Sequence, residues 1–169
     1  ALYRKLYPFF DRTFIADSYS CRIGKGTHKA LNRFREFGYK VSRNNTRTCW
    51  ILECDIKKFF ANIDHEVLVK ILEGYIPDGN IVWLLGEVIG SFSSTRPYVG
   101  LPLGNLTSQL LANIYMNEFD QFVKRRLSDK YSNILQNVGI LGEAKETRYI
   151  RYADDFVFFS GNRELLEGF

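Results

Sequence analysis

The spacing of apolar residues predicts a chain in which amphipathic helices alternate with short apolar strands. Where apolar residues recur every three or four positions, the period is that of a helix with one buried face. Helices are expected over residues 1–10, 27–38, 65–76, 80–92 and 106–127, and again from residue 163. Thr27, Asp64 and Asn162 are the expected N-caps, and Gly38 is the expected C-cap of its helix.

Two segments have the composition of β-strands. Residues 47–55 are rich in β-branched, aromatic and apolar side chains and end near Asp55. Residues 149–160 read YIRYADDFVFFS, and a β-hairpin with Asp154 and Asp155 at its tip is the simplest geometry for them. The order strand, helices, long helix, hairpin, helix predicts an α+β fold whose strands pair across long connections.

Composition places the chain among globular proteins. Its 169 residues are 46% hydrophobic and 15% aromatic, which suits one sizeable core. We find no internal repeat, low-complexity tract or linker, so the sequence gives no support for independent domains. The net charge of +4 permits a nucleic-acid partner and is far below that of a polybasic protein.

Cysteine usage and hydropathy bear on the compartment. Cys21, Cys49 and Cys54 fit neither a disulfide framework nor a zinc site, which indicates unpaired thiols in a reducing, cytoplasmic compartment. No run approaches the roughly 18 apolar residues of a membrane span, so no membrane is expected as a partner. Both ends of the sequence interrupt helical patterns, and we expect the chain to be part of a longer polypeptide.

The acidic residues are the strongest candidates for chemistry. A hairpin tip directs Asp154 and Asp155 toward one site, and Asp55 follows a strand upstream. Clustered carboxylates repel one another unless cations lie between them, and Mg²⁺ prefers such oxygen ligands. An isolated Asp-Asp pair is typical of a solvated turn. The apolar strands around this pair and the similar setting of Asp55 favour a metal site.

With these residues the chain resembles reverse transcriptases, whose palm carries an aspartate at a strand end and a Tyr-x-Asp-Asp hairpin. "GLPLGNLTSQ" resembles the family motif Pro-x-Gly-x-x-x-Ser-Pro/Gln, which begins the long palm helix, with Pro102, Gly104, Ser108 and Gln109 at its fixed positions. "SYSCRIGKGTHKALNRF" resembles the segment that joins fingers to palm in bacterial members. An ordinary loop before an amphipathic helix explains the apolar residues of 106–127 but not the whole ordered string.

The resemblance implies an α+β right-hand polymerase palm with partial fingers, an antiparallel sheet backed by helices, and a thumb outside this chain. Residues 1–46 would belong to the fingers and the fingers–palm connection, and residues 47–169 to the palm.

The resemblance also implies a metal site. Asp55, Asp154 and Asp155 would form the acidic cluster, and the carbonyl of Ile56 would complete the shell of the nucleotide-bound ion. Two Mg²⁺ ions, which Mn²⁺ can replace, would lie about 3.5 to 4 Å apart. For Asp155, orientation of the primer end is the alternative role.

By the same resemblance, one set of residues would bind the incoming dNTP. Its members are Lys58, Phe59, Phe60, Pro102, Leu103, Gly104 and Gln109. Backbone amides at Lys58 and Phe59 would meet the triphosphate, while Phe60 would be the steric gate against a 2′-hydroxyl. The alternatives are a solvated lysine at position 58 and a core phenylalanine at position 60.

A second set would contact template or primer phosphates through charge that is independent of sequence. It comprises the basic residues Arg22, Lys25, Lys29, Arg33 and Arg35, and Tyr152 is a further expected nucleic-acid-binding residue. An ordinary solvent-facing helix also explains the basic side chains. Implied partners are an RNA template, a DNA primer and dNTPs, with an accessory protein of the retroelement as a further candidate.

The resemblance therefore predicts RNA-templated DNA synthesis by two-metal transfer from dNTPs to a primer 3′-hydroxyl. Leu103 and Gln109 resemble enzymes of diversity-generating retroelements, where group II intron enzymes usually have glutamine and proline. Two alternatives stay open. An RNA-directed RNA polymerase usually has a second aspartate where Phe59 and Phe60 stand, and a degenerate palm would serve as a nucleic-acid-binding or assembly module.

Overall fold

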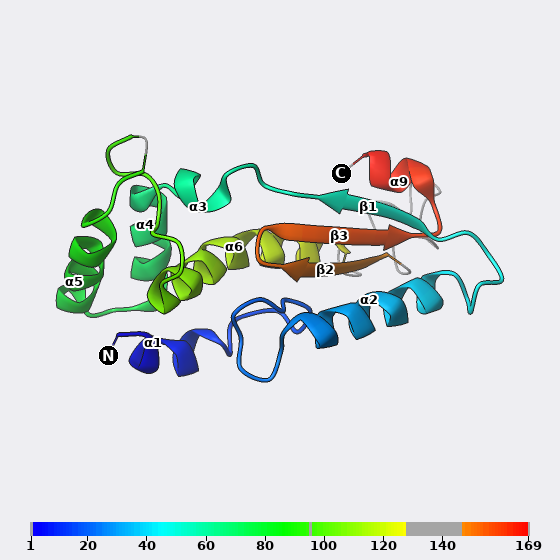
Figure 1. Cartoon of the computed structure of the whole chain (residues 1–169), viewed down its shortest axis with the longest axis horizontal. Helices are drawn as coiled ribbons and strands as arrows, with labels where there is room; N and C mark the ends of the chain where they lie inside the picture. The colour runs from blue at the N-terminus through cyan, green and yellow to red at the C-terminus, as the bar shows by residue number, and fades with distance from the viewer. Residues whose placement is uncertain (1, 95, 128–146, 169) are drawn as a thin grey trace. The chain divides into compact units, whose positions relative to one another are not determined.

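The computed structural model describes residues 2–94, 96–127 and 147–168 (Figure 1). Contacts divide the chain into two units, one of residues 1–14 and 56–118, the other of residues 15–55 and 119–169. The expected boundary between fingers and palm after residue 46 does not coincide with these units, and it stays a prediction. Each unit is described by itself.

The second unit is built on a three-stranded antiparallel sheet, which confirms the predicted α+β class. Its strands are β1 (Trp50–Cys54), β2 (Arg148–Tyr152) and β3 (Asp155–Ser160), in the order β1-β3-β2 (Figure 1). The predicted hairpin is therefore present as β2–β3, and β1 joins it across a long stretch of chain. The first strand begins at Trp50, three residues later than Arg47, where we had expected it.

Helices cover both faces of this sheet. Side chains alternate between the two faces along each strand, so apolar side chains of the strands need cover on both. On one face, α2 (Thr27–Val41) packs against β2 and β3 (Figure 1). The cluster on that face contains Tyr19, Ala30, Phe37, Val41, Ile150 and Phe159. The cluster on the other face contains Ile15, Val123, Tyr149, Phe158 and Leu166. It draws on α6 (Leu106–Leu127) and α9 (Arg163–Glu167).

Both predicted ends of α2 are wrong. The N-cap is Gly26, and Thr27 is the first helical residue, whose hydroxyl makes no capping hydrogen bond. At the other end the helix passes Gly38 and closes at Ser42. Val41 is buried against the sheet, and that burial outweighs the tendency of a glycine to end a helix.

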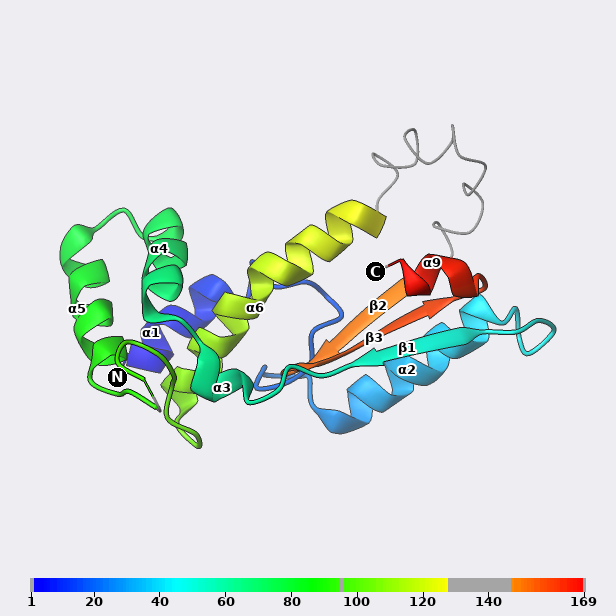
Figure 2. The ribbon, with the colours of Figure 1, turned by 90° about the horizontal axis from the view of Figure 1, so that it is seen from above.

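The first unit is helical, with α1 (Leu2–Phe10), α3 (Phe59–Asn62), α4 (His65–Tyr75), α5 (Gly79–Gly90) and the first part of α6. Helices α4 and α5 lie side by side (Figure 2). The predicted cap Asp64 is confirmed, because its carboxylate accepts from the Val67 amide. Asp78 caps α5 in the same way, so that helix begins at Gly79, one residue before the predicted start.

Two expectations from composition can be compared with the fold. None of Cys21, Cys49 and Cys54 forms a disulfide. Among the helices in the described ranges, none is long and apolar enough to cross a membrane.

In the second unit, Asn162 caps α9 as predicted, with its side chain accepting from the Leu165 amide.

Candidate active site

The connection between β2 and β3 carries the aspartate pair. We call residues Tyr152–Asp155 the acidic turn. Tyr152 ends β2 and pairs with Asp155, which begins β3, so only Ala153 and Asp154 lie between the strands. Ala153 has φ 57°, a left-handed conformation that two-residue hairpins require and that costs an L-residue about 1 kcal/mol. The turn thus places Asp154 at the tip and Asp155 at the first pair of the ladder.

The sheet register brings Asp55 to the same end. The last β1–β3 pair is Cys54 with Phe156. Asp55 is one residue after Cys54 and Asp155 one residue before Phe156, so the next register position sets Asp55 opposite Asp155. This arrangement depends on pairing between residues a hundred positions apart, and it brings together the three carboxylates that the sequence predicted.

Negative charge is crowded at the end of the sheet that carries Asp55, Asp154 and Asp155. Desolvation, followed by repulsion from Asp154, Asp55 and Glu53, raises the pKa of Asp155. Because the Asp155 side chain is still exposed, water screens part of this repulsion. A bound cation would relieve the part of this repulsion that water does not screen.

The donor chemistry of these residues fits a magnesium ion, since all three offer carboxylate oxygens. In the described parts of the chain, no group of three or more His, Cys, Asp or Glu side chains is already arranged to hold a metal. The backbone brings Asp55, Asp154 and Asp155 to one end of the sheet without drawing their side chains into a preformed ligand set.

Tyr152 connects the acidic turn to α2. Its hydroxyl lies 3.0 Å from the Thr27 hydroxyl, across the face of the sheet that α2 covers. Thr27 is the residue that the sequence suggested as an N-cap, and its hydroxyl bonds to the turn instead. Tyr152 remains partly exposed, as a nucleic-acid contact requires.

The basic residues assigned to nucleic acid are held by carbonyls of their own loop. Arg22 donates through Nη1 to the carbonyls of Ile15, at 2.7 Å, and Ser18, at 3.0 Å. Lys25 donates to the Ala16 carbonyl at 2.6 Å, and Lys29 donates to the carbonyl of a loop glycine. These bonds give each residue a structural role, and their contact with phosphates stays a prediction.

The residues assigned to dNTP binding lie in the first unit. Lys58 has φ 53° and precedes α3. The Phe59 amide donates to the Ile56 carbonyl at 3.1 Å, so this amide already has a partner and the carbonyl keeps one lone pair for another. Phe60 is half-buried, and its carbonyl accepts from the Leu101 amide at 2.8 Å. That bond brings the predicted steric gate and the glycine-containing loop together.

The loop before α6 presents residues 102–104 to solvent, with the Leu103 side chain 78% exposed. Gly104 has φ 81°, a conformation that favours glycine. Asn105 accepts from the Thr107 amide at 2.8 Å and so caps α6, whose first turns contain the buried Ser108 and the half-buried Gln109.

Sequence reasoning missed Gly100. It has φ 103°, and a Cβ built on it would lie 2.7 Å from the Ser94 Cβ. Its amide donates to the Ile63 carbonyl at 2.8 Å, and its carbonyl bonds His65 Nε2 at 2.7 Å. Its position just before the recognised loop motif was the available signal. His65 is accordingly a buried hydrogen-bonding residue.

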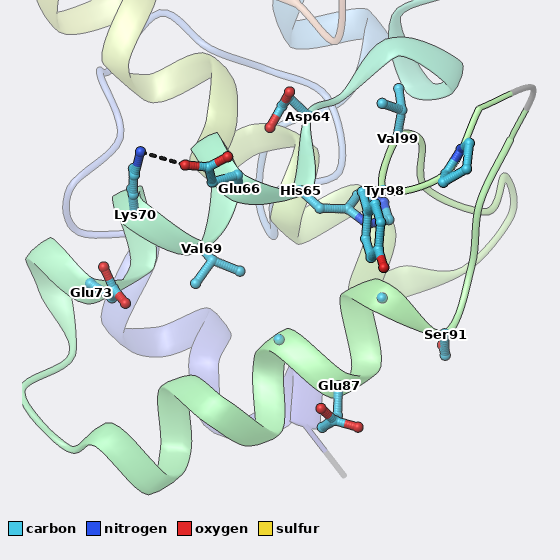
Figure 3. A pocket seen from close by; sticks show the side chains of 13 residues that line it. Asp64, His65, Glu66, Val69, Lys70, Glu73, Glu87, Ser91, Tyr98 and Val99 are labelled. Atoms are coloured by element: carbon cyan, nitrogen blue, oxygen red, sulfur yellow. Dashed lines mark hydrogen bonds and ion pairs between the residues drawn. The ribbon is translucent and has the colours of Figure 1, made fainter.

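A separate pocket of about 860 Å³ lies between α4, α5 and residues 97–99 (Figure 3). Asp64, Glu66, Glu73 and Glu87 line it, and Glu66 pairs with Lys70 at 2.7 Å. None of the predicted site residues lines it. Its acidic lining repels polyphosphates, so it is not a candidate for the nucleotide site.

Comparison with protein families decides the identity. The model of the family "Reverse transcriptase (RNA-dependent DNA polymerase)" matches residues 1–168. The chain belongs to the reverse transcriptase family. This reverse transcriptase chain is 29% identical to protein YkfC of Escherichia coli over 93% of its own length and 46% of that protein. It is 32% identical to the group II intron-encoded protein LtrA of Lactococcus lactis, over 70% of its own length and 19% of that protein.

Solved structures support the fold of this reverse transcriptase chain. Apo telomerase from Candida tropicalis, truncated from its C-terminal domain, matches with a TM-score of 0.62 at 13% identity, over 98% of this chain and 34% of that one. Telomerase from Candida albicans, solved with a fragment of telomeric RNA, matches with a TM-score of 0.63 at 13% identity, over 99% and 30%. The chain therefore has the fold of part of a reverse transcriptase. It spans less than half of the length of each relative named here.

Proposed function

We propose that this chain forms the catalytic palm of a reverse transcriptase that copies an RNA template into DNA. The observation that carries the proposal is the meeting of Asp55, Asp154 and Asp155 at one end of a three-stranded sheet. Their arrangement follows from backbone register and a two-residue turn, so it does not depend on flexible loops. Membership of the family supports the same activity.

In the proposed reaction, the 3′-hydroxyl oxygen of a DNA primer attacks the α-phosphorus of a dNTP. The bond from that phosphorus to the bridging oxygen breaks, pyrophosphate leaves, and the hydroxyl proton passes to water. Asp55 and Asp154, with the Ile56 carbonyl, would hold two Mg²⁺ ions, which stabilise charge on the attacking and leaving oxygens when bound. Asp155 would bind metal weakly or orient the primer end.

Specificity for dNTPs is assigned to Phe60 and the loop of residues 102–104. A ribose 2′-hydroxyl would collide with the Phe60 ring, whose helix is tied to that loop by the bond from Leu101. Pro102, Leu103, Gly104 and Gln109 would line the nucleotide, and the exposure of Leu103 supports this role. The backbone near Lys58 would meet the triphosphate.

The biological setting proposed is a retroelement. Leu103 and Gln109 favour the diversity-generating type, in which a template repeat is copied with errors at adenines. Relatives named as intron-encoded proteins favour the group II type, and both types perform the chemistry above. Template and primer phosphates would meet Arg22, Lys25, Lys29 and Tyr152 through charge and hydrogen bonds.

The test is primer extension by the full-length protein on an RNA template with dNTPs and Mg²⁺. Wild type should extend the primer, and Asp154→Ala should lower the rate by at least about 10³-fold while the fold stays intact. Asp78→Asn is the matched control, because asparagine caps a helix as well as aspartate. Extension with NTPs but not dNTPs would identify an RNA polymerase. Nucleic-acid binding without any extension by wild type would identify a binding module.

A further inference from the structure

A buried ion pair lies behind the acidic turn. Arg151 of β2 is 1% exposed and Asp120 of α6 is fully buried. Arg151 donates hydrogen bonds to the Asp120 carboxylate. Its Nε lies 2.9 and 3.0 Å from the two oxygens, and its Nη2 lies 2.7 Å from Oδ2. The Tyr149 hydroxyl donates to Oδ1 of the same carboxylate at 2.6 Å.

The remaining nitrogen of the guanidinium reaches the acidic turn. Nη1 of Arg151 donates to the Ala153 carbonyl at 2.7 Å. Ala153 is the left-handed residue of that turn, and its carbonyl belongs to the peptide bond that leads into Asp154. The planar guanidinium of Arg151 therefore links the Asp120 carboxylate of α6 to the Ala153–Asp154 peptide, which orients the aspartate pair.

The backbone of Arg151 is also fixed. Its amide donates to the Asp17 carbonyl at 2.9 Å, and its carbonyl accepts from the Tyr19 amide at 3.0 Å. With its backbone held by residues 17 and 19 and its Nε and Nη2 atoms held by Asp120, Arg151 is fixed where Nη1 meets the acidic turn.

We propose that Asp120 and Arg151 are positioning residues that hold the Ala153 peptide and thereby direct Asp154 and Asp155 toward the cation site. The catalytic part of this inference rests on the proposed function, while the structural part does not. Burying an ion pair gains little stability over apolar residues of similar size. The ion pair matters here because Arg151 also bonds the Ala153 carbonyl. Only a guanidinium satisfies a carboxylate and a backbone carbonyl in one plane.

The structural part is tested by NMR on the full-length protein. Ala-Asp occurs twice in the 169-residue sequence, as Ala16–Asp17 and Ala153–Asp154, so labelling alanine carbonyls with ¹³C and aspartate amides with ¹⁵N gives two signals from this chain. Asp154→Asn assigns the turn signal. Arg151→Lys should displace the Ala153–Asp154 signal and leave the Ala16–Asp17 signal in place. An Ala153–Asp154 signal that stays in place would overturn the proposal.

The catalytic part is tested by separating kcat from the Mg²⁺ requirement. Arg151→Lys should lower kcat at least tenfold and raise the Mg²⁺ concentration for half-maximal rate at least threefold, with an unchanged KM for primer and template. Arg163→Lys, which alters an exposed ion pair with Glu167, should change neither value. A lower kcat at an unchanged Mg²⁺ requirement would mean a role in stability alone and would overturn the positioning role.

A variant without the ion pair controls for folding. Asp120→Leu/Tyr149→Phe/Arg151→Met replaces the charged cluster by apolar residues of similar size, so that no charge is left buried without its partner, and it removes the donor to the Ala153 carbonyl. We expect a melting temperature within a few degrees of wild type together with the displaced Ala153 signal and the raised Mg²⁺ requirement. Wild-type behaviour in both readouts would overturn the proposal. If wild type copies no RNA at all, the proposed function fails while the NMR result still decides the structural part.

Discussion

Asp55 stands opposite Asp155, one register position beyond the Cys54–Phe156 pair that closes the β1–β3 ladder. The two residues are separated by a hundred positions, and Asp154 of the β2–β3 turn immediately precedes Asp155. The sheet therefore gathers three negative charges at one end before any cation arrives. That gathering is unfavourable in the empty site, and it is the cause of the raised pKa of Asp155 beyond its desolvation.

The first prediction concerns stability and pH. The pKa of Asp155 is raised in the folded protein, so its favourable contribution is complete below the unfolded pKa and is lost as the pH rises through the folded pKa. Asp155→Asn should therefore raise the melting temperature by about 1–3 °C at pH 7 without divalent ions. The gain should vanish toward pH 3 and shrink when Mg²⁺ is added.

Thermal unfolding followed across pH checks this result. Asp78→Asn, at an N-cap that asparagine can also fill, should show no such pH-dependent gain. A lower melting temperature for Asp155→Asn at neutral pH would mean that the carboxylate is compensated within the chain.

The second prediction concerns sugar selection. Phe60→Val should let the protein accept ribonucleotides, with discrimination against NTPs reduced at least about tenfold, because the ring that meets a 2′-hydroxyl is gone. Single-nucleotide extension with each dNTP and NTP measures the ratio of kcat/KM. Phe122→Ala, at an exposed position of α6, is the control. Unchanged discrimination in Phe60→Val would assign this ring to packing against Phe59.

The third prediction concerns the glycine that sequence reasoning missed. Gly100→Ala combines a strained φ of 103° with a Cβ 2.7 Å from the Ser94 Cβ, and should lower the free energy of unfolding by about 2–4 kcal/mol. Gly24→Ala is the matched control, since Gly24 has φ 75° and open space around it. It should cost about 1 kcal/mol, the strain alone. Equal losses in denaturant unfolding would show that the close contact at Gly100 relaxes freely.

The fourth prediction concerns fidelity. Because Leu103 is 78% exposed, Leu103→Gln should leave stability unchanged and act only on the nucleotide. An amide restores a hydrogen bond that an aliphatic side chain lacks, so errors opposite template adenines should fall several-fold, by about 1 kcal/mol of discrimination. Sequencing of the copied DNA measures the error rate. An unchanged rate would remove the basis for the diversity-generating assignment.

The elements themselves were largely predictable, because their signals are local. Apolar spacing placed the helices, and the caps Asp64 and Asn162 follow from side chains within three residues of the amides they bind. The hairpin followed from two apolar runs around an aspartate pair. The ends of α2 were mispredicted because burial of Val41 and the bond from Thr27 to Tyr152 depend on the sheet.

The support of the site was not predictable for the same physical reason. Asp120 of α6 and Arg151 of β2 both stand among polar as well as apolar neighbours in the sequence, and neither residue indicates its partner 31 positions away. A charged residue in a buried stretch does signal that a partner exists, since an unpaired buried charge is too costly. Which residue supplies it depends on how β2 lies against α6, and sequence spacing does not encode that.

The most direct test of the central claim is Mn²⁺ binding to the full-length protein, followed by electron paramagnetic resonance with RNA template, DNA primer and a non-hydrolysable dNTP present. Wild type should bind two ions per protein, and Asp55→Asn and Asp154→Asn should each weaken binding at least about tenfold, because one carboxylate ligand is lost. Asp78→Asn should bind as wild type does. Equal Mn²⁺ binding by Asp154→Asn and wild type would contradict the assignment of the acidic turn as the metal site.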